Sequence, residues 1–308
     1  MSDIGAASLI SRRLPRMPLH LSTQANCVNS EAARLYRDMG FRRIIPGREL
    51  SLKEIEEIRS KVDVELEVFV HGAMCLAYSG RCFLSAAMAG RSANRGDCAH
   101  SCRWGYRVLE EGERPGEYYP VEEGDRFTTI LSSKDLCLID HLDRLRSAGV
   151  DALKIEGRMK SVYYTAVTTR AYRKALDALE DPKAEPPGPY RDELLKVSHR
   201  ELSTGFLFGR EEIAKPIDRD YERPYIFLAT VERMVSPDTF LLEVRNRIWE
   251  NDELEFAGYD VPFLVDRDFQ LLDGEMNRVS KVNHGAPCHI RTAAPIKEGY
   301  IIRRRNRE

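Results

Sequence analysis

The sequence predicts an α/β protein, in which a partial (β/α) barrel is followed by a small C-terminal β-barrel domain. Over residues 1–180, short apolar runs alternate with amphipathic helical stretches, which is typical of a parallel sheet covered on both faces. Beyond a proline-rich segment, β-branched and aromatic residues alternate in short runs separated by turns, which is typical of a small β-barrel. A length of 308 residues is also typical of two domains.

The chain opens with a helix over residues 4–13 and continues with two strands, each followed by a helix. In chain order these four elements cover residues 18–22, 29–39, 43–46 and 51–61. Asn29 or Ser30 opens the first of the two later helices, and Ser51 with Glu54 forms a capping box at the start of the second.

A third strand, 64–70, runs directly into His71, and a fourth, 152–156, lies between predicted helices over 135–148 and 161–179. These elements make four βα units, whereas a closed barrel takes eight. The sequence therefore predicts an open or half barrel, or a chain that begins inside a larger domain.

The predicted domain organisation has three parts. Residues 1–180 form the partial barrel and carry a cysteine-rich insertion over 72–137. Residues 181–223 form a proline-rich linker and connecting segment, because the prolines after 181 cannot continue the preceding helix. Residues 224–308 form the small β-barrel.

The composition predicts a cytoplasmic protein. It also predicts that any surface that binds RNA is a local cluster of positive charge. A formal charge of −2 creates no global field that attracts nucleic acid or membrane. No window reaches the roughly 18 apolar residues of a membrane span, and we expect no membrane partner. Local arginine clusters, such as the group over 303–307, are the candidates for phosphate contacts, although such a run is more often a solvated face.

Polar residues follow the predicted strands at their carboxyl ends, where a (β/α) barrel places its active site. These candidates are Arg48, Glu49, His71, Glu156 and Arg158. His71 is a candidate general acid or base, or a residue that holds the following loop by a backbone contact. Glu49 and Glu156 either orient a substrate or pair with Arg48 and Arg158.

Five of the seven cysteines fall in one stretch: Cys75, Cys82, Cys98, Cys102 and Cys137. In a reducing compartment such a group binds metal or does redox chemistry more often than it forms disulfides. The irregular gaps contain no CxxC pair and fit thiolates gathered from several loops around an iron–sulfur cluster, with zinc or free redox thiols as the alternatives. The two remaining cysteines, Cys27 and Cys288, are expected to pack as small hydrophobic residues.

The run EVFVHGAMCLAYSGRC over residues 67–82 resembles the signature of the collagenase-like peptidase family, a family of unknown catalytic type. Further stretches that resemble the same family are 19–26, 48–52, 132–137, 153–160 and 198–206. Together these stretches span most of the chain.

This resemblance implies a TIM-like barrel, of which the chain holds roughly the second half, followed by a small β domain. It also implies a [4Fe–4S] cluster and oxygen-independent hydroxylation of RNA, with prephenate as a possible co-substrate. The implied ligands are Cys75, Cys82, Cys98 and Cys137, with Cys102 in exchange with Cys98 as the alternative. No stretch of this sequence resembles the N-terminal section of the family. We therefore expect a missing section or a partner chain to complete the barrel.

The leading prediction is therefore an iron–sulfur enzyme that hydroxylates RNA, most specifically tRNA uridine, with tRNA as its partner. A peptidase acting on collagen-like or denatured protein is the first alternative, although the sequence contains neither GxSxG nor HExxH. A non-enzymatic binding module with structural zinc is the second alternative.

Overall fold

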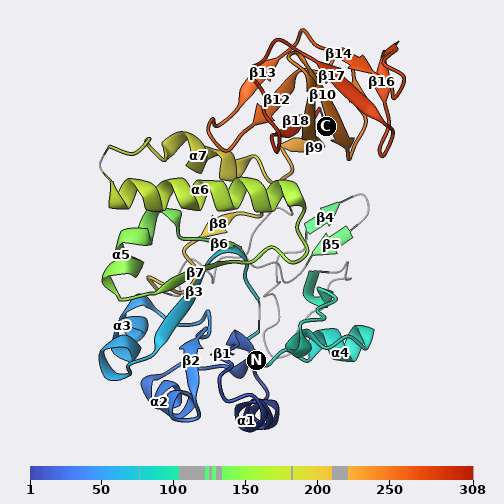
Figure 1. The fold of residues 1–308 in the computed structure, drawn as a ribbon. Helices are drawn as coiled ribbons and strands as arrows, with labels where there is room; N and C mark the ends of the chain where they lie inside the picture. The colour runs from blue at the N-terminus through green and yellow to red at the C-terminus, as the bar shows by residue number, and fades with distance from the viewer. Residues whose placement is uncertain are drawn as a thin grey trace. The chain divides into compact units, whose positions relative to one another are not determined.

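The computed structural model describes residues 1–75, 77–103, 122–124, 127–129, 134–181, 183–209 and 221–307. These residues form two compact units, whose elements are labelled in Figure 1. The first unit contains Met1–Arg158 and His199–Tyr221. The second unit contains Met159–Ser198 and Glu222–Glu308.

The first unit begins with the alternation of helices and strands that the sequence predicts. Its first elements are α1 (Ile4–Arg13), β1 (Leu19–Leu21), the 3-10 helix η1 (Thr23–Ala25), α2 (Ser30–Asp38), β2 (Phe41–Ile44), α3 (Leu52–Lys61) and β3 (Glu65–Ala73). Its later elements are α4 (Leu84–Ala89), η2 (Ala93–Arg95), η3 (Ser101–Arg103), β4 (Glu122–Gly124), β5 (Phe127–Thr129), β6 (Asp135–Cys137), η4 (Ile139–His141), α5 (Leu142–Ser147), β7 (Ala152–Ile155) and β8 (Leu202–Ser203).

Both predicted helix starts are confirmed. The Asn29 side chain accepts a hydrogen bond from the backbone N–H of Ala32 at 2.8 Å and so caps α2. Ser51 and Glu54 form the reciprocal capping box of α3, in which the Glu54 carboxylate accepts from the Ser51 backbone N–H at 2.8 Å.

Four parallel strands lie side by side in chain order, β1, β2, β3 and β7 (Figure 1). Leu66, Val68 and Val70 alternate along β3 and are buried in the core of the first unit, and Ile55 and Ile58 form the buried side of α3. Among the described strands β1, β7 and β8 each pair with only one other strand, so the sheet is open. The arrangement brings the carboxyl ends of β1, β2, β3 and β7 to one edge, while the TIM-like geometry stays a prediction.

Two boundaries differ from the prediction. Strand β3 extends to Ala73, so His71 lies inside the strand rather than after it. The helix predicted over 135–148 is wrong at its start, because Asp135–Cys137 forms β6 and the α-helix α5 covers only Leu142–Ser147. Pairing with β3 on one side and β8 on the other outweighs the helical spacing of the apolar residues.

Among its described residues, the second unit contains two α-helices, a 3-10 helix and ten strands. They are α6 (Val162–Glu180), α7 (Gly188–Asp192), η5 (Glu193–Leu195), β9 (Tyr225–Ser236), β10 (Thr239–Val244), β11 (Ile248–Trp249), β12 (Leu254–Ala257), β13 (Leu264–Asp266), β14 (Gln270–Leu272), β15 (Arg278–Val279), β16 (Lys281–Val282), β17 (Cys288–Arg291) and β18 (Ile301–Arg305).

The β structure predicted over 224–308 takes the form of a curled antiparallel sheet. Its eight strands run in the order β13-β12-β18-β9-β10-β17-β14-β15, and a two-stranded sheet of β11 and β16 accompanies it. Within the described strands β13 and β15 are not paired with each other, so the sheet is a half-barrel. It encloses one apolar core that includes Leu228, Phe256, Leu271 and Ile290.

The structure divides the chain at a different place from the predicted boundary at 180. Helix α6 belongs with the β sheet of the second unit, because its side chains form hydrogen bonds and ring contacts with residues of that sheet. Tyr163 stacks on Phe227 with ring centroids 5.8 Å apart and accepts a hydrogen bond from Arg303 at 3.1 Å. Parts of the predicted insertion 72–137 and linker 181–223 lie outside the described residues, so their outlines stay predictions.

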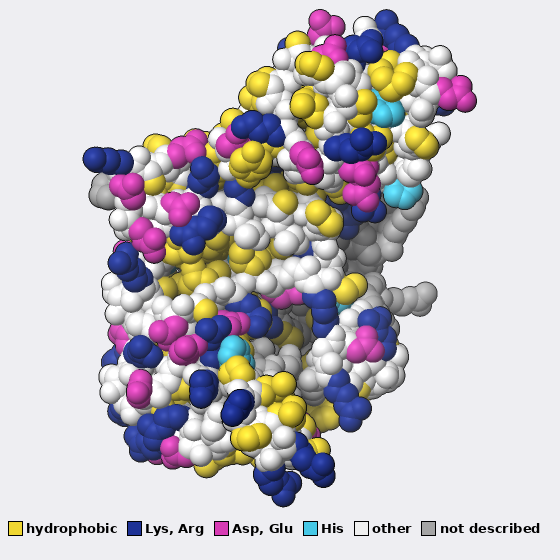
Figure 2. Space-filling model, viewed as in Figure 1, with side chains coloured by type: hydrophobic (Ala, Val, Ile, Leu, Met, Phe, Trp, Pro, Cys, Tyr) yellow, Lys and Arg dark blue, Asp and Glu magenta, His cyan; other side chains and the backbone are white. Residues whose placement is uncertain are grey.

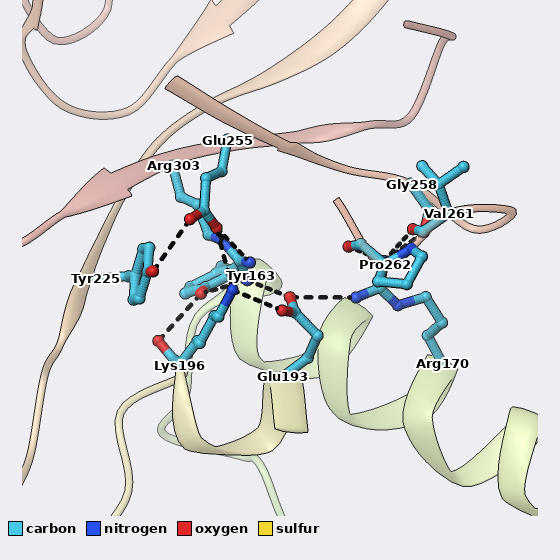
Figure 3. Close-up of polar contacts among 10 residues, drawn as sticks. All are labelled: Tyr163, Arg170, Glu193, Lys196, Tyr225, Glu255, Gly258, Val261, Pro262 and Arg303. Atoms are coloured by element: carbon cyan, nitrogen blue, oxygen red, sulfur yellow. Dashed lines mark hydrogen bonds and ion pairs between the residues drawn. The ribbon is translucent and has the colours of Figure 1, made fainter. Parts of the chain in front are cut away.

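A buried polar cluster, which we call the Arg303 network, fixes α6 and η5 to the sheet (Figure 3). The Arg303 side chain is fully buried and pairs with Glu193 at 2.5 Å and with Glu255 at 2.7 Å. Arg170 donates to the backbone carbonyls of Val261 and Pro262 at 3.0 and 3.1 Å. Since these groups come from both the helices and the strands, the network makes one folding unit of them.

Basic and acidic side chains are interspersed over the face of the molecule that Figure 2 shows, in keeping with the small net charge. Among the described residues, none of the helices combines the length and the apolar character needed to cross a bilayer.

Candidate functional site

The predicted site residues gather at the carboxyl edge of the parallel sheet. His71 is 2% exposed and lies between two strands, opposite Cys137 of β6 and Ile155 of β7 in the pairing register. The His71 carbonyl accepts a hydrogen bond from the Glu156 backbone N–H at 2.8 Å. The sheet therefore brings His71, Glu156 and Cys137 together, while both predicted roles of the His71 side chain stay predictions.

Arg48 follows β2 and contacts the end of β3. Its guanidinium donates to the Ala73 carbonyl at 2.5 Å and lies 4.5 Å from the centroid of the Phe69 ring. Arg48 and Phe69 also line a small pocket, whose other walls include Leu136 and Phe206. The pocket combines a cation with apolar walls, and its volume of about 20 Å³ leaves room for roughly one water molecule.

The Glu49 carboxylate holds the cysteine-rich segment instead of pairing with Arg48. It accepts hydrogen bonds from both the backbone N–H and the hydroxyl of Ser79, the latter at 3.1 Å. The hydroxyl of Thr23, at the end of β1, lies 3.4 Å from that of Ser79 and donates to the Pro46 carbonyl at 3.0 Å. These buried contacts tie the loop between Cys75 and Cys82 to the ends of β1 and β2.

Glu156 and Arg158 lie close to two glycines of the cysteine-rich segment. A Cβ atom on Gly72, whose φ is +106°, would be 2.4 Å from the Glu156 carbonyl oxygen, so only glycine fits there. A Cβ atom on Gly96 would be 3.2 Å from an Arg158 guanidinium nitrogen. The Glu156 carboxylate accepts from the Arg158 backbone N–H at 3.1 Å. Arg158 is thus placed beside the segment that ends in Cys98.

Among the described residues, the thiols of the cysteine-rich segment form no disulfide and are at least partly exposed. Burial raises the pKa of the Cys75 thiol and the neighbouring thiols of Cys82 and Cys98 raise it further, whereas a backbone hydrogen bond and the charge of Arg48 lower it. Cys75 therefore lies near two other predicted ligands. Cys137 is separate in sequence, and β6 places it next to β3, the strand that leads into Cys75.

Within the described ranges, no three His, Cys, Asp or Glu side chains are gathered tightly enough to hold a single metal ion.

The two other cysteines differ in kind from the partly exposed group. Cys27 and Cys288 are both completely buried, and burial raises the pKa of Cys27 to about 11 and that of Cys288 to about 12. Such thiols are inert, which confirms their predicted packing role.

Sequence reasoning missed one buried ion pair next to the site. Asp135 in β6 accepts from the Arg200 side chain at 2.6 and 3.0 Å, and from its backbone N–H at 3.1 Å. Both side chains are almost completely buried. No local pattern identifies this pair, because its members are 65 residues apart.

Comparisons with known proteins identify the family of this chain and several similar proteins. The family model "Peptidase family U32" matches residues 1–216. The tRNA hydroxylation protein P of Escherichia coli (strain K12) is 42% identical over 250 residues, which cover 67% of this chain and 54% of that protein. The tRNA hydroxylation protein P1 of Bacillus subtilis (strain 168) is 35% identical over 283 residues, which cover 89% of this chain and 65% of that protein.

A 23S rRNA 5-hydroxycytidine synthase of Escherichia coli (strain K12) is 40% identical over 185 residues, which cover 60% of this chain and 27% of that protein. The chain thus spans between about half and two thirds of the length of the two tRNA hydroxylation proteins.

Proposed function

The chain belongs to peptidase family U32, and from this membership we propose that it is an iron–sulfur enzyme for oxygen-independent hydroxylation of RNA, most specifically of tRNA uridine. The observation that carries the proposal is the 42% identity, over 250 residues, to a protein named for tRNA hydroxylation. The group of exposed thiols at the carboxyl edge of a parallel sheet supports it, because enzymes with such sheets do their chemistry there.

We assign Cys75, Cys82, Cys98 and Cys137 as the ligands of a [4Fe–4S] cluster, with Cys102 as the alternative to Cys98. The donor set fits such a cluster, which is held by thiolates from separate loops. Cys75 has Cys82 and Cys98 as electrostatic neighbours, and the pairing of β3 with β6 brings in the strand of Cys137. Burial raises the pKa of Cys75 overall, and the charge of Arg48 acts in the opposite direction, toward the thiolate form that binds iron.

When bound, the cluster would supply redox chemistry, while the protein supplies binding and orientation. His71 is buried at the sheet edge and would hold a proton at an imidazole nitrogen. Arg48 and Arg158 would attract the anionic substrate, and the Glu156 carboxylate keeps the Arg158 backbone in place. The Glu49 carboxylate, which is bonded to Ser79, would position the ligand loop instead of touching substrate.

We also propose prephenate as the co-substrate, because the family resemblance implies one. The pocket beside Arg48 is too small to hold it, since its volume of about 20 Å³ is roughly that of a single water molecule.

An anaerobic preparation analysed for iron, sulfide and zinc tests the cluster. We expect about four irons with matching sulfide per chain, as a cubane held by four thiolates requires. The variant Cys82→Ser should lose the cluster, while Cys288→Ala, a change in the core of the second unit, should retain it. Full iron content in Cys82→Ser would refute the ligand assignment.

The same preparation distinguishes the other functions. Colourless protein with one zinc per chain would favour a binding module with structural zinc. Cleavage of gelatin by iron-free protein would favour the peptidase that the family name implies. Loss of the 5-hydroxyuridine signal from tRNA nucleosides in a strain lacking the gene, restored by the gene, would support the hydroxylase.

We further propose that additional strands, from a longer form of this protein or from a partner chain, complete the sheet at β1. Among the described strands β1 pairs only with β2. We also propose a cytoplasmic location, because that is where a tRNA substrate is found.

A further inference from the structure

The two-stranded sheet of β11 and β16 carries an exposed basic surface around one tryptophan. Ile248 and Val282 are cross-strand partners and are buried in the core of the second unit. Because side chains alternate along a strand, the next pair, Trp249 and Lys281, faces outward. In Figure 1, β16 lies at the margin of the second unit.

Trp249 lies between two cations. The Arg247 guanidinium is 5.6 Å and the Lys281 ammonium 5.3 Å from the centroid of the indole. Both cationic side chains are exposed, whereas Trp249 is half-buried and therefore held in a defined position. We call Arg247, Trp249 and Lys281 the Trp249 patch.

The charge of the Trp249 patch is not neutralised locally. Nearby carboxylates are already paired: Glu243 with Arg245 at 2.6 Å, Glu250 with Arg278, and Asp252, which accepts from the Trp249 backbone N–H, with Arg307 at 2.9 Å. Arg247 instead donates to the neutral Asn283 amide at 2.9 Å. Within the described part of the chain neither Arg247 nor Lys281 forms an ion pair, so two positive charges remain beside the indole.

We propose that the Trp249 patch binds an unpaired nucleotide of the RNA substrate, with a base stacked on Trp249 and the flanking phosphates on Arg247 and Lys281. An aromatic face with flanking cations is the combination by which proteins bind single-stranded nucleic acid. The two cations have long side chains that no carboxylate restrains, so they can turn from the indole to a phosphate. The inference rests on the proposed RNA substrate and adds a contact surface in the second unit.

The simpler role for these residues is to stabilise the two-stranded sheet through cation–π contacts. The two roles predict different results. A stacking surface tolerates another aromatic ring and depends on salt, whereas a purely structural contact changes the melting temperature and leaves RNA affinity unchanged.

The test measures the Kd of the full chain for a labelled, unmodified tRNA transcript at several salt concentrations. Trp249→Ala should weaken binding about tenfold, within the range that one stacked base contributes, and Trp249→Phe should stay close to wild type. Lys281→Gln should lower the salt slope by about 0.7, the value for one single-strand phosphate contact. Arg233→Gln removes an exposed cation from β9 outside the patch and should bind as wild type.

Melting temperatures of all variants are measured in parallel. If Trp249→Ala does not fold, Trp249→Phe and Lys281→Gln still test the inference. If the wild type binds tRNA and the Trp249 and Lys281 variants bind equally well, the inference is wrong while the proposed function stands. If the wild type binds no RNA, the proposed function fails as well. Equal losses in Arg233→Gln and Lys281→Gln would show a diffuse charge effect and would also overturn the patch.

Discussion

The buried ion pair between Asp135 and Arg200 should be a major source of stability in the first unit. The Arg200 side chain is 0% exposed and that of Asp135 is 3% exposed, and the carboxylate accepts from Nη2 at 2.6 Å and Nε at 3.0 Å. Replacing Asp135 with Asn keeps the shape and a hydrogen-bond acceptor but removes the charge. The guanidinium then stays buried beside a neutral amide.

Removing one partner of a buried ion pair typically costs roughly 3–5 kcal/mol, because the other charge remains desolvated. Asn still accepts a hydrogen bond, so we expect about 3 kcal/mol for Asp135→Asn. That is a large part of the roughly 5–15 kcal/mol that holds a typical protein folded. At roughly 1–3 kcal/mol per molar urea, it lowers the unfolding midpoint of the first unit by about 1–3 M.

Urea unfolding is combined with hydrogen exchange of peptides containing β6 and β8, so that the two units are followed separately. The matched control is Glu201→Gln, which removes the neighbouring, more exposed ion pair with Lys134 and should cost less than about 1 kcal/mol. The double variant Asp135→Leu, Arg200→Met should regain most of the loss. A destabilisation of Asp135→Asn no larger than that of Glu201→Gln would refute the reasoning.

Two further predictions follow from the sheet. Burial alone raises the pKa of Glu67, but hydrogen bonds and charges from Lys154 and Arg43 lower it overall. A lowered pKa means that its stabilisation is present above the unfolded value of about 4.3 and is lost as the pH falls through the folded value. The difference in unfolding free energy between wild type and Glu67→Gln, about 1 kcal/mol at pH 7, should therefore shrink below about pH 4. An unchanged difference down to pH 3 would contradict this. Gly72→Ala should cost at least about 2 kcal/mol by thermal unfolding, because its Cβ would overlap the Glu156 carbonyl. Gly90→Ala, also at positive φ but in open space, should cost less, and equal costs would show that the close approach does not matter.

The parts of the fold that local signals encode were predicted correctly. The caps at Asn29 and Ser51 and the strands around Leu19 and Leu66 depend on neighbouring residues and on apolar periodicity. The helix predicted from 135 was wrong because its first residues pair with strands that are distant in sequence. A short stretch of sequence does not include those distant strands, so it cannot show that strand pairing prevails over a helix.

The same reason limits the prediction of the candidate site. Position near the ends of strands predicted Arg48, Glu49, His71 and Glu156 as site residues, a role that stays a prediction. It did not indicate that Glu49 bonds to Ser79, which lies 30 residues away. The assignment of α6 to the second unit likewise depends on Tyr163 contacts with Phe227 and Arg303.

The cysteine-rich segment is held at both ends by buried polar contacts, and this bears on how a cluster would bind. Glu49 and Thr23 hold Ser79 near the first two predicted ligands, and Asp135, bonded to Arg200, holds the strand of the last one. These contacts involve only protein groups, so they can form before any iron arrives. A site organised in this way loses less conformational entropy on binding than loops that fold around the metal. Weakening either contact should therefore reduce cluster occupancy even when all four cysteines are present.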